Sequence, residues 1–415
     1  MNHDVIAPVL LVLAVVLLAA KLGGDLAVRA GQPAVLGELI AGIAIGNIPA
    51  AVIPWLAGLR GDPTLDILSR LGVVILLFEV GLESTVSQMM KVGLSSLVVA
   101  TLGVIAPMAL GWGVGAWLLP DESWHLHLFL GAVLCATSVG ITARVFKDLG
   151  RLATREARIV LGAAVIDDVQ GLVVLAAVSS VIASANAGEG VSWIQVLAPL
   201  VKAALFLGGA ILLGAYLSPR LFHVASKLRA RGVLLATGLS FCFVLAWLAD
   251  GIGLAPIVGA FAAGLILEDA HTRDFRVRGE RPLGQLVEPI SAFLVPVFFV
   301  LMGMRTDLGA FAQPGVLGLA AALTVAAILG KQVCALGVVG RGVDRLTVGI
   351  GMIPRGEVGL IFANVGLGLT LHGERVIDAA TFSAIVVMVI VTTMITPPAL
   401  KWSLARGAGR DASKS

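Results

Sequence analysis

Ile159–Val178, IVLGAAVIDDVQGLVVLAAV, is an apolar stretch of twenty residues interrupted only by Asp167, Asp168 and Gln170. As an α-helix rising about 1.5 Å per residue, it matches a bilayer hydrocarbon core of about 30 Å. The two carboxylates then lie near the middle of the membrane, where an aspartate costs about 2.5 to 3.5 kcal/mol on insertion scales. One interpretation is a structural pair satisfied by neighbouring helices. We favour a functional pair that faces a cavity or a partner helix.

The composition of the whole chain is that of a polytopic membrane protein. Of its 415 residues, 58% are hydrophobic and only 13% are charged, which is too apolar for a soluble globular protein. The net charge of +3 gives no reason to expect a nucleic-acid partner. The three cysteines stand singly in apolar segments, so we expect neither a disulfide framework nor a structural metal. They are Cys135, Cys242 and Cys334.

Thirteen apolar segments, separated by Gly, Pro or charged residues, are candidate membrane-spanning helices. They are 4–29, 34–47, 64–83, 92–119, 126–149, 155–184, 192–219, 231–250, 254–268, 284–304, 316–340, 344–371 and 377–402. Of the 29 Lys and Arg residues, 21 fall in the C-terminal tail, in the connections after odd-numbered segments, or in the parts of the segments that flank them. The positive-inside rule therefore predicts that the N-terminus lies outside and the C-terminus in the cytoplasm.

An internal repeat relates segments that are 222 residues apart. VLGELIAGIAIG, which starts at Val35, aligns with IVGAFAAGLILE, which starts at Ile257, and FEVGLEST aligns with VLMGMRTD at the same offset. The matched glycines are Gly37 with Gly259, Gly42 with Gly264 and Gly81 with Gly303. The related segments are separated by an odd number of spans and so run in opposite directions. An inverted-topology repeat of this kind is typical of secondary transporters.

The same offset relates segments 126–149 and 344–371, and we expect both helices to be interrupted. In CATSVGIT, hydroxyl groups compete for backbone hydrogen bonds, and in MIPRGEVG a proline removes a donor while a glycine relaxes the backbone. Broken helices at this depth line a cavity and present partial charges at their ends. An ordinary kinked helix is the alternative. The candidate residues are Thr137, Ser138 and Gly140 in the first segment and Pro354, Arg355, Gly356 and Glu357 in the second.

Lys331 lies in the apolar sequence VAAILGKQVCALGVV, about 13 Å from the cytoplasmic end of its segment at helical rise. An ammonium at that depth must be neutral or paired with a counter-charge. A lysine that snorkels to the cytoplasmic surface is the alternative.

These motifs, in this order and spacing, resemble those of the monovalent cation:proton antiporter-2 family, which includes NapA-like sodium/proton antiporters and the membrane domain of Kef potassium efflux systems. The resemblance covers essentially the whole chain and rests on PAVLGELIAGIAIGN, LGVVILLFEVGLE, CATSVGITARVF, AAVIDDVQGLVVLA, PVFFVLMGM and GMIPRGEVGLIFA. It implies an all-α polytopic membrane protein of about 13 transmembrane helices, with an inverted-topology repeat and two interrupted crossing helices.

The resemblance also implies a domain organisation. Residues 1–91 and 231–305 would form a scaffold that dimerises, and residues 92–184 and 316–402 a moving, ion-binding core. Residues 192–219 would be a linker helix, and residues 403–415 a short cytoplasmic tail in place of the nucleotide-binding domain of Kef systems. The implied setting is the inner membrane of a bacterium, where a homodimer is surrounded by membrane lipid.

Carried over to this sequence, Asp168 matches the family's essential ion- and proton-binding aspartate. Asp167 matches the first acid of the pair in electrogenic members, and Lys331 matches its ion-pair partner. Gln170 departs from the apolar residue of many relatives. The resemblance implies a secondary transporter, not an enzyme, with no catalytic residues and no cofactor. It would exchange protons for a monovalent cation, Na⁺ first and Li⁺ or K⁺ as alternatives, by alternating access and with net charge movement.

Other functions remain open at this point. A K⁺/H⁺ antiporter, or a Kef-like K⁺ efflux protein without a regulatory domain, would use the same residues. A channel or a sensor that reuses the fold would not couple cation movement to protons. An intramembrane aspartyl protease needs two facing acids on different helices, whereas Asp167 and Asp168 are adjacent on one helix.

Overall fold

The residues described by the computed structural model are 6–48, 58–83, 86–187, 193–228, 230–267, 275, 280–306, 308–309, 316–340, 342–371 and 373–412. Their regular structure is helical except for one short antiparallel hairpin, in which β1 (Thr370–Leu371) pairs with β2 (Glu374–Arg375). The prediction of an all-α protein is confirmed.

Each of the thirteen predicted apolar segments contains helix among its described residues, and the number of membrane crossings stays a prediction. Within the described part of the chain, 8 helical stretches are long and apolar enough to cross a membrane. They are Val9–Arg29, Ser87–Leu118, Trp124–Asp148, Arg155–Ser179, Val233–Gly251, Leu283–Met304, Val316–Gly337 and Ala379–Arg406. Three shorter apolar helices accompany them: Ala34–Gly46, Pro256–Ile266 and Val358–Gly368. The chain is therefore an integral membrane protein with multiple apolar helices.

The chain divides into two compact units. Unit 1 comprises Met1–Met90 and Val201–Arg305, and unit 2 comprises Lys91–Leu200 and Thr306–Ser415. Two long helices, α5 (Val86–Leu118) and α9 (Trp193–Ser226), each have residues in both units. The functions predicted for the two parts, scaffold and moving core, stay predictions.

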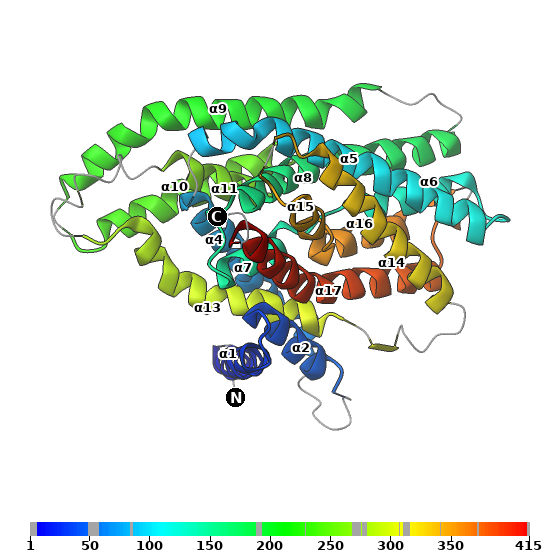
Figure 1. Ribbon diagram of the computed structural model, residues 1–415, viewed down its shortest axis with the longest axis horizontal. Coiled ribbons are helices and arrows are strands. Elements are labelled where there is room, and N and C mark those ends of the chain that lie inside the picture. Colours follow the sequence, from blue (N-terminus) through cyan, green and yellow to red (C-terminus); the bar gives the residue numbers. More distant parts are fainter. Residues whose placement is uncertain are drawn as a thin grey trace. The chain divides into compact units, whose positions relative to one another are not determined.

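The elements of unit 1 are α1 (Ile6–Arg29), α2 (Ala34–Gly46), η1 (Gly58–Gly61), α4 (Pro63–Leu82), α10 (Val233–Gly251), α11 (Pro256–Ile266) and α13 (Leu283–Met304). Helix α13 packs along α4 and α2 (Figure 1), and α11 packs against α4. Asp62 caps the N-terminus of α4 by accepting hydrogen bonds from two backbone N–H groups of its first turn.

The contact between α2 and α13 depends on glycine. A Cβ on Gly42 would overlap the backbone carbonyl of Val300, and a Cβ on Gly303 would overlap the carbonyl of Leu39. The backbones of the two helices can approach this closely only because neither position carries a side chain.

The contact between α4 and α11 has the same construction. A Cβ on Gly264 would overlap the carbonyl of Phe78, and a Cβ on Gly81 would overlap the carbonyl of Phe261. All four residues of this contact lie 222 positions from a residue of the α2–α13 contact. The sequence repeat therefore coincides with a repeated helix contact.

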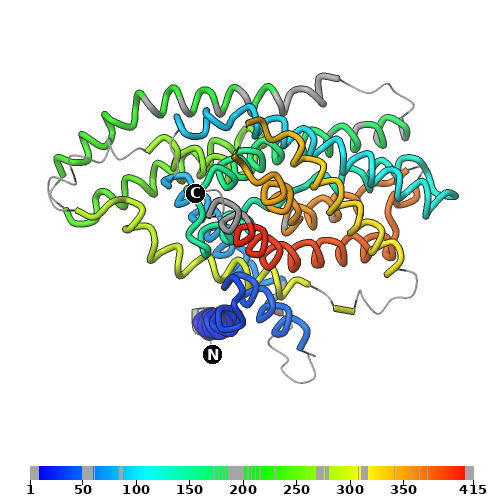
Figure 2. The backbone as a smooth tube through the Cα atoms, in the orientation of Figure 1, coloured from blue at the N-terminus to red at the C-terminus, as the bar shows by residue number. Residues whose placement is uncertain are grey.

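The elements of unit 2 are α6 (Trp124–Cys135), α7 (Val139–Asp148), α8 (Arg155–Ala187), α14 (Val316–Val333), η4 (Cys334–Gly337), α15 (Arg345–Gly351), α16 (Gly356–Gly368) and α17 (Ala379–Ala412), together with β1 and β2. Helix α14 lies beside α17 (Figure 2), and α6 lies against α8. The apolar core joins α6, α14 and α17 through side chains that include Phe129, Leu323 and Met388, all fully buried.

Both segments that were predicted to be interrupted are divided into two helices. The first break separates Cys135, the last residue of α6, from Val139, the first of α7. The second separates Gly351, the last residue of α15, from Gly356, the first of α16. The second segment ends slightly earlier than predicted, because α16 is followed by the β1–β2 hairpin and not by further helix.

Candidate ion-binding site

The two helix breaks of unit 2 are bonded to each other. The backbone N–H of Ser138 donates to the carbonyl of Pro354 at 2.7 Å. One turn along α7, the hydroxyl of Thr142 donates to the carbonyl of Gly351, also at 2.7 Å. A break inside an apolar medium must satisfy the backbone groups that it frees. Here each break supplies partners for the other.

Gly356 closes the second break in a conformation that other residues rarely adopt. Its φ is +46°, and a Cβ at this position would lie 2.6 Å from the hydroxyl oxygen of Ser138. Its N–H donates to the hydroxyl of Thr393 on α17 at 3.2 Å. The hydroxyl of Thr393 thus takes the place of a capping group at the start of α16.

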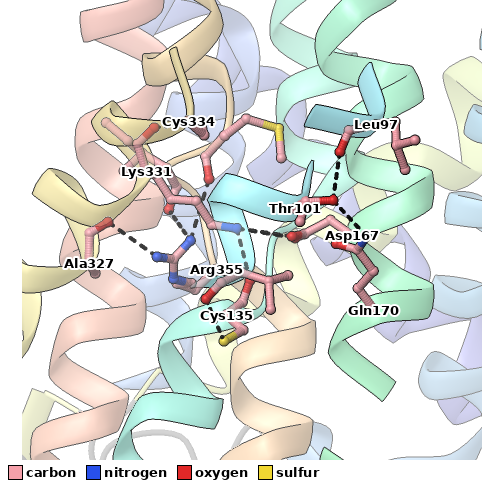
Figure 3. A network of polar contacts seen from close by, with 12 residues as sticks. Leu97, Thr101, Cys135, Asp167, Gln170, Ala327, Lys331, Cys334 and Arg355 are labelled. Atoms are coloured by element: carbon pink, nitrogen blue, oxygen red, sulfur yellow. Dashed lines mark hydrogen bonds and ion pairs between the residues drawn. The ribbon is translucent and has the colours of Figure 1, made fainter. Parts of the chain in front are cut away.

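Lys331 on α14 binds Asp167 on α8 in the interior of unit 2 (Figure 3). Its Nζ atom lies 3.2 Å from both carboxylate oxygens, and both side chains are 0% exposed. Nζ also donates to the carbonyl of Cys135 at 2.9 Å. Because Cys135 is the last residue of α6, this carbonyl belongs to the negative end of a helix, where a cation is stabilised.

Gly103 on α5 leaves room for this ammonium. A Cβ at Gly103 would lie only 3.3 Å from Nζ of Lys331. The ammonium therefore lies between the Asp167 carboxylate, the carbonyl of Cys135 and the α5 backbone at Gly103.

Arg355 is a second buried cation in the same region (Figure 3). Its guanidinium is 0% exposed and donates to the carbonyl of Ile353 at 3.2 Å and to that of Ala327 at 3.2 Å. Ile353 lies just after α15, and Ala327 lies one turn before Lys331 on α14. Both breaks thus present carbonyls to a buried basic side chain.

Asp168 follows Asp167 on α8 and points about 100° away around the helix. It is also buried, with 9% of its surface exposed. Thr137, in the first break, is buried beside Asp167. The two adjacent acids therefore point in different directions around α8, and Lys331 binds the first of them, Asp167.

Three other predicted residues have simpler positions. Gly140 lies in the first turn of α7 and is buried, and Pro354 contributes the carbonyl that binds Ser138. Glu357 is in the first turn of α16, and its side chain lies outside the described residues, so its role stays a prediction.

Helix α17 is attached to both halves of the second interrupted segment. Thr393 bonds the start of α16, whereas Ser403 shares a 2.7 Å hydrogen bond with Thr347 of α15. Pro397 and Pro398 lie between these two attachment points, inside the helix. Each proline removes a backbone donor, so α17 is weakened where its two attachments separate.

Sequence reasoning did not identify Cys135, Gly103, Ala327 or Thr393. A predicted helix break implies backbone carbonyls and N–H groups without partners inside the helix. Cys135, which directly precedes the predicted break, could have been identified in this way. The other three are ordinary apolar or small positions whose contribution depends on which helix lies opposite. Within the described ranges, no cluster of three or more His, Cys, Asp or Glu side chains could hold a metal ion.

The chain is similar to known proteins over nearly its whole length. The sodium/hydrogen exchanger transmembrane family matches residues 9–406. The chain is 37% identical to the high-affinity Na(+)/H(+) antiporter NhaS3 of Synechocystis sp., covering 96% of this chain and 90% of that protein. It is also 37% identical to the Na(+)/H(+)-K(+) antiporter GerN of Bacillus cereus, covering 97% of this chain and 98% of that protein.

Among solved structures, the chain resembles the sodium proton antiporter MjNhaP1 from Methanocaldococcus jannaschii. The TM-score is 0.60 over 95% of this chain and 96% of that chain, at 16% sequence identity, and the likeness shows the fold. The relatives are transporters, which excludes the protease interpretation. From the extent of the family match and the identity to full-length relatives, this chain belongs to the sodium/hydrogen exchanger family.

Proposed function

We propose that this protein is a secondary active transporter that exchanges Na⁺ for H⁺ across the membrane. The observation that carries the proposal is the buried contact between Lys331 and Asp167 beside the crossing of two interrupted helices, with Asp168 next in the chain. The names of the relatives, which describe Na⁺/H⁺ antiporters, support the choice of ions.

Asp168 is the residue that we assign to cation and proton binding. Burial favours the neutral form of a carboxyl group, whereas a bound cation favours the charged form. Proton and cation then exclude one another at this group. An unloaded, charged carboxylate is costly to carry through an apolar interior, so the site changes sides only when it is loaded.

The Asp167–Lys331 pair accounts for net charge movement in this mechanism. When a cation approaches Asp167, it competes with the ammonium for the same carboxylate. Of the contacts described above, Lys331 then keeps only its hydrogen bond to the carbonyl of Cys135. An ammonium in an apolar interior loses a proton readily when it has no counter-charge. A second proton is then exchanged for one cation, and the cycle carries charge.

The helix breaks and the repeated contacts suggest how the site changes sides. We propose that the glycine contacts of unit 1, which recur 222 residues apart, reflect an inverted-topology repeat of thirteen membrane crossings. Unit 2 would be the moving core, and unit 1 a scaffold that forms a homodimer in the inner membrane. The N-terminus would lie outside and the C-terminus in the cytoplasm.

K⁺ is the second candidate cation, because GerN is named as an antiporter of Na⁺, H⁺ and K⁺. Purified protein in liposomes tests both ions. With an imposed pH gradient and a pH-sensitive dye inside, addition of Na⁺, Li⁺ or K⁺ should dissipate the gradient for each transported cation. A cation flux that does not move protons would contradict exchange and would indicate a channel.

A further inference from the structure

Gln170 is a polar residue of α8 that the mechanism above does not use. It follows Asp167 by three residues, which places it about 60° away around the helix and about 4.5 Å along the axis. Gln170 and Asp167 therefore share one side of α8 (Figure 3), whereas Asp168 is about 200° from Gln170.

The orientation of the Gln170 amide is fixed by α5. Its Nε2 donates to the hydroxyl of Thr101 at 3.1 Å, and that hydroxyl donates its single proton to the carbonyl of Leu97 at 2.9 Å. Thr101 can therefore only accept from the amide. The NH₂ group of Gln170 must face Thr101, and its carbonyl oxygen Oε1 must face the other way.

No donor in the described part of the chain satisfies this Oε1 atom, although the atom is buried. A buried acceptor without a partner costs about 1 to 3 kcal/mol, so such an atom calls for a bound water or ion. The Gln170 side chain as a whole is only half-buried, whereas Asp167 is sealed from solvent. Gln170 is thus more exposed than Asp167 on the same side of α8.

We propose that Oε1 of Gln170 is a ligand for the transported cation at the stage when the cation approaches Asp167, before it binds Asp168, and that Gln170 contributes to cation specificity. This inference rests on the proposed exchange function. An amide oxygen is a neutral, hard ligand of the kind that alkali cations bind, and the number and strength of such oxygens discriminate between cations. Because the amide does not titrate, it affects cation affinity and not the number of protons exchanged.

The test compares wild type with Gln170→Met, which keeps the length of the side chain and removes its polar atoms. We expect the KM for Na⁺ to rise about three- to tenfold, with different changes for Li⁺ and K⁺, while the maximal rate changes less than about twofold. Gln170→Glu keeps an oxygen at this position and should retain the affinity. Thr101→Val is the matched control, since it removes the same hydrogen bond but leaves Oε1 in place, and its effect on KM should be smaller.

Thermal stabilisation of the purified proteins by Na⁺, Li⁺ and K⁺ provides a readout that does not require transport. Cation-dependent stabilisation should be weaker in Gln170→Met than in wild type. If KM and the cation-dependent shift are unchanged for all three cations, and only the melting temperature without cation falls, Gln170 is a packing residue that holds water, and the inference is wrong. Loss of exchange in wild type itself would instead contradict the proposed function, and the cation-dependent shift would still report on Gln170.

Discussion

The ammonium of Lys331 lies 3.2 Å from both carboxylate oxygens of Asp167, and neither side chain reaches the surface. Removing one member of a buried ion pair costs about 3 to 5 kcal/mol, because the remaining charge is left unpaired. Removing both members leaves no such charge. The pair can therefore be tested by comparing single and double variants.

For this test, we expect Lys331→Gln alone to be less stable than the double variant Asp167→Asn, Lys331→Gln. Asp167→Asn should retain some exchange but respond less to membrane potential, because the second proton is lost. The measurement is Na⁺-driven proton flux in liposomes with the potential clamped by valinomycin, together with the melting temperature of each variant. Identical voltage dependence in all four proteins would contradict the proposed origin of charge movement.

Asp168→Asn should abolish exchange for every cation while expression and folding stay close to normal. The amide has nearly the shape of the carboxyl group, but it neither titrates nor supplies a charge. Dye-based exchange assays with Na⁺, Li⁺ and K⁺ measure the effect, and gel filtration of the purified variant controls for folding. Na⁺-dependent proton flux in this variant would contradict the assignment of Asp168 as the ion- and proton-binding residue.

Gly356→Ala should disrupt the crossing of the two breaks, because the new Cβ would lie 2.6 Å from the hydroxyl oxygen of Ser138 at a φ of +46°. A non-glycine residue in this region costs about 1 kcal/mol or more before any clash is counted. We expect a lower melting temperature and a lower exchange rate. Gly368→Ala, near the end of α16 where a Cβ meets nothing within 4 Å, is the control.

The hydroxyl of Thr393 should matter for the same crossing. Thr393→Val keeps the side-chain shape but leaves the N–H of Gly356 without its 3.2 Å bond, which should cost about 1 to 3 kcal/mol. Melting curves measure the change, and exchange should fall in parallel. If Thr393→Val melts like wild type, another group caps α16.

Replacing Pro397 and Pro398 together by Ala should stiffen α17 between its contacts with α16 and α15. Alanine restores the backbone donors that the prolines remove, so the helix gains hydrogen bonds. We expect a higher melting temperature and a slower maximal exchange rate with little change in KM. An unchanged rate would show that α17 does not bend during the cycle.

The sequence by itself determined that the molecule is a membrane protein and which of its charged residues are candidates for the site. Long apolar segments exclude a soluble fold, and a charge inside such a segment is expensive enough that Asp167, Asp168 and Lys331 stand out without a structure. Hydroxyl groups in CATSVGIT, and the proline and glycine in MIPRGEVG, weaken the helix locally, so the two breaks were also predictable. The repeat was visible because close backbone contacts tolerate only glycine at a fixed spacing.

Only the tertiary structure decided what these groups contact. The carbonyl of Cys135 and the bare backbone at Gly103 meet Lys331 because α6, α5 and α14 converge, and no pattern within one helix encodes that. Arg355 binds Ile353 and Ala327 carbonyls because of the way the second break folds back on α14. Hydrophobicity along a chain sets which segments enter the membrane, but in a uniformly apolar medium it does not select partners. Partner choice rests on close packing and on hydrogen bonds between backbone groups, and these depend on geometry in three dimensions.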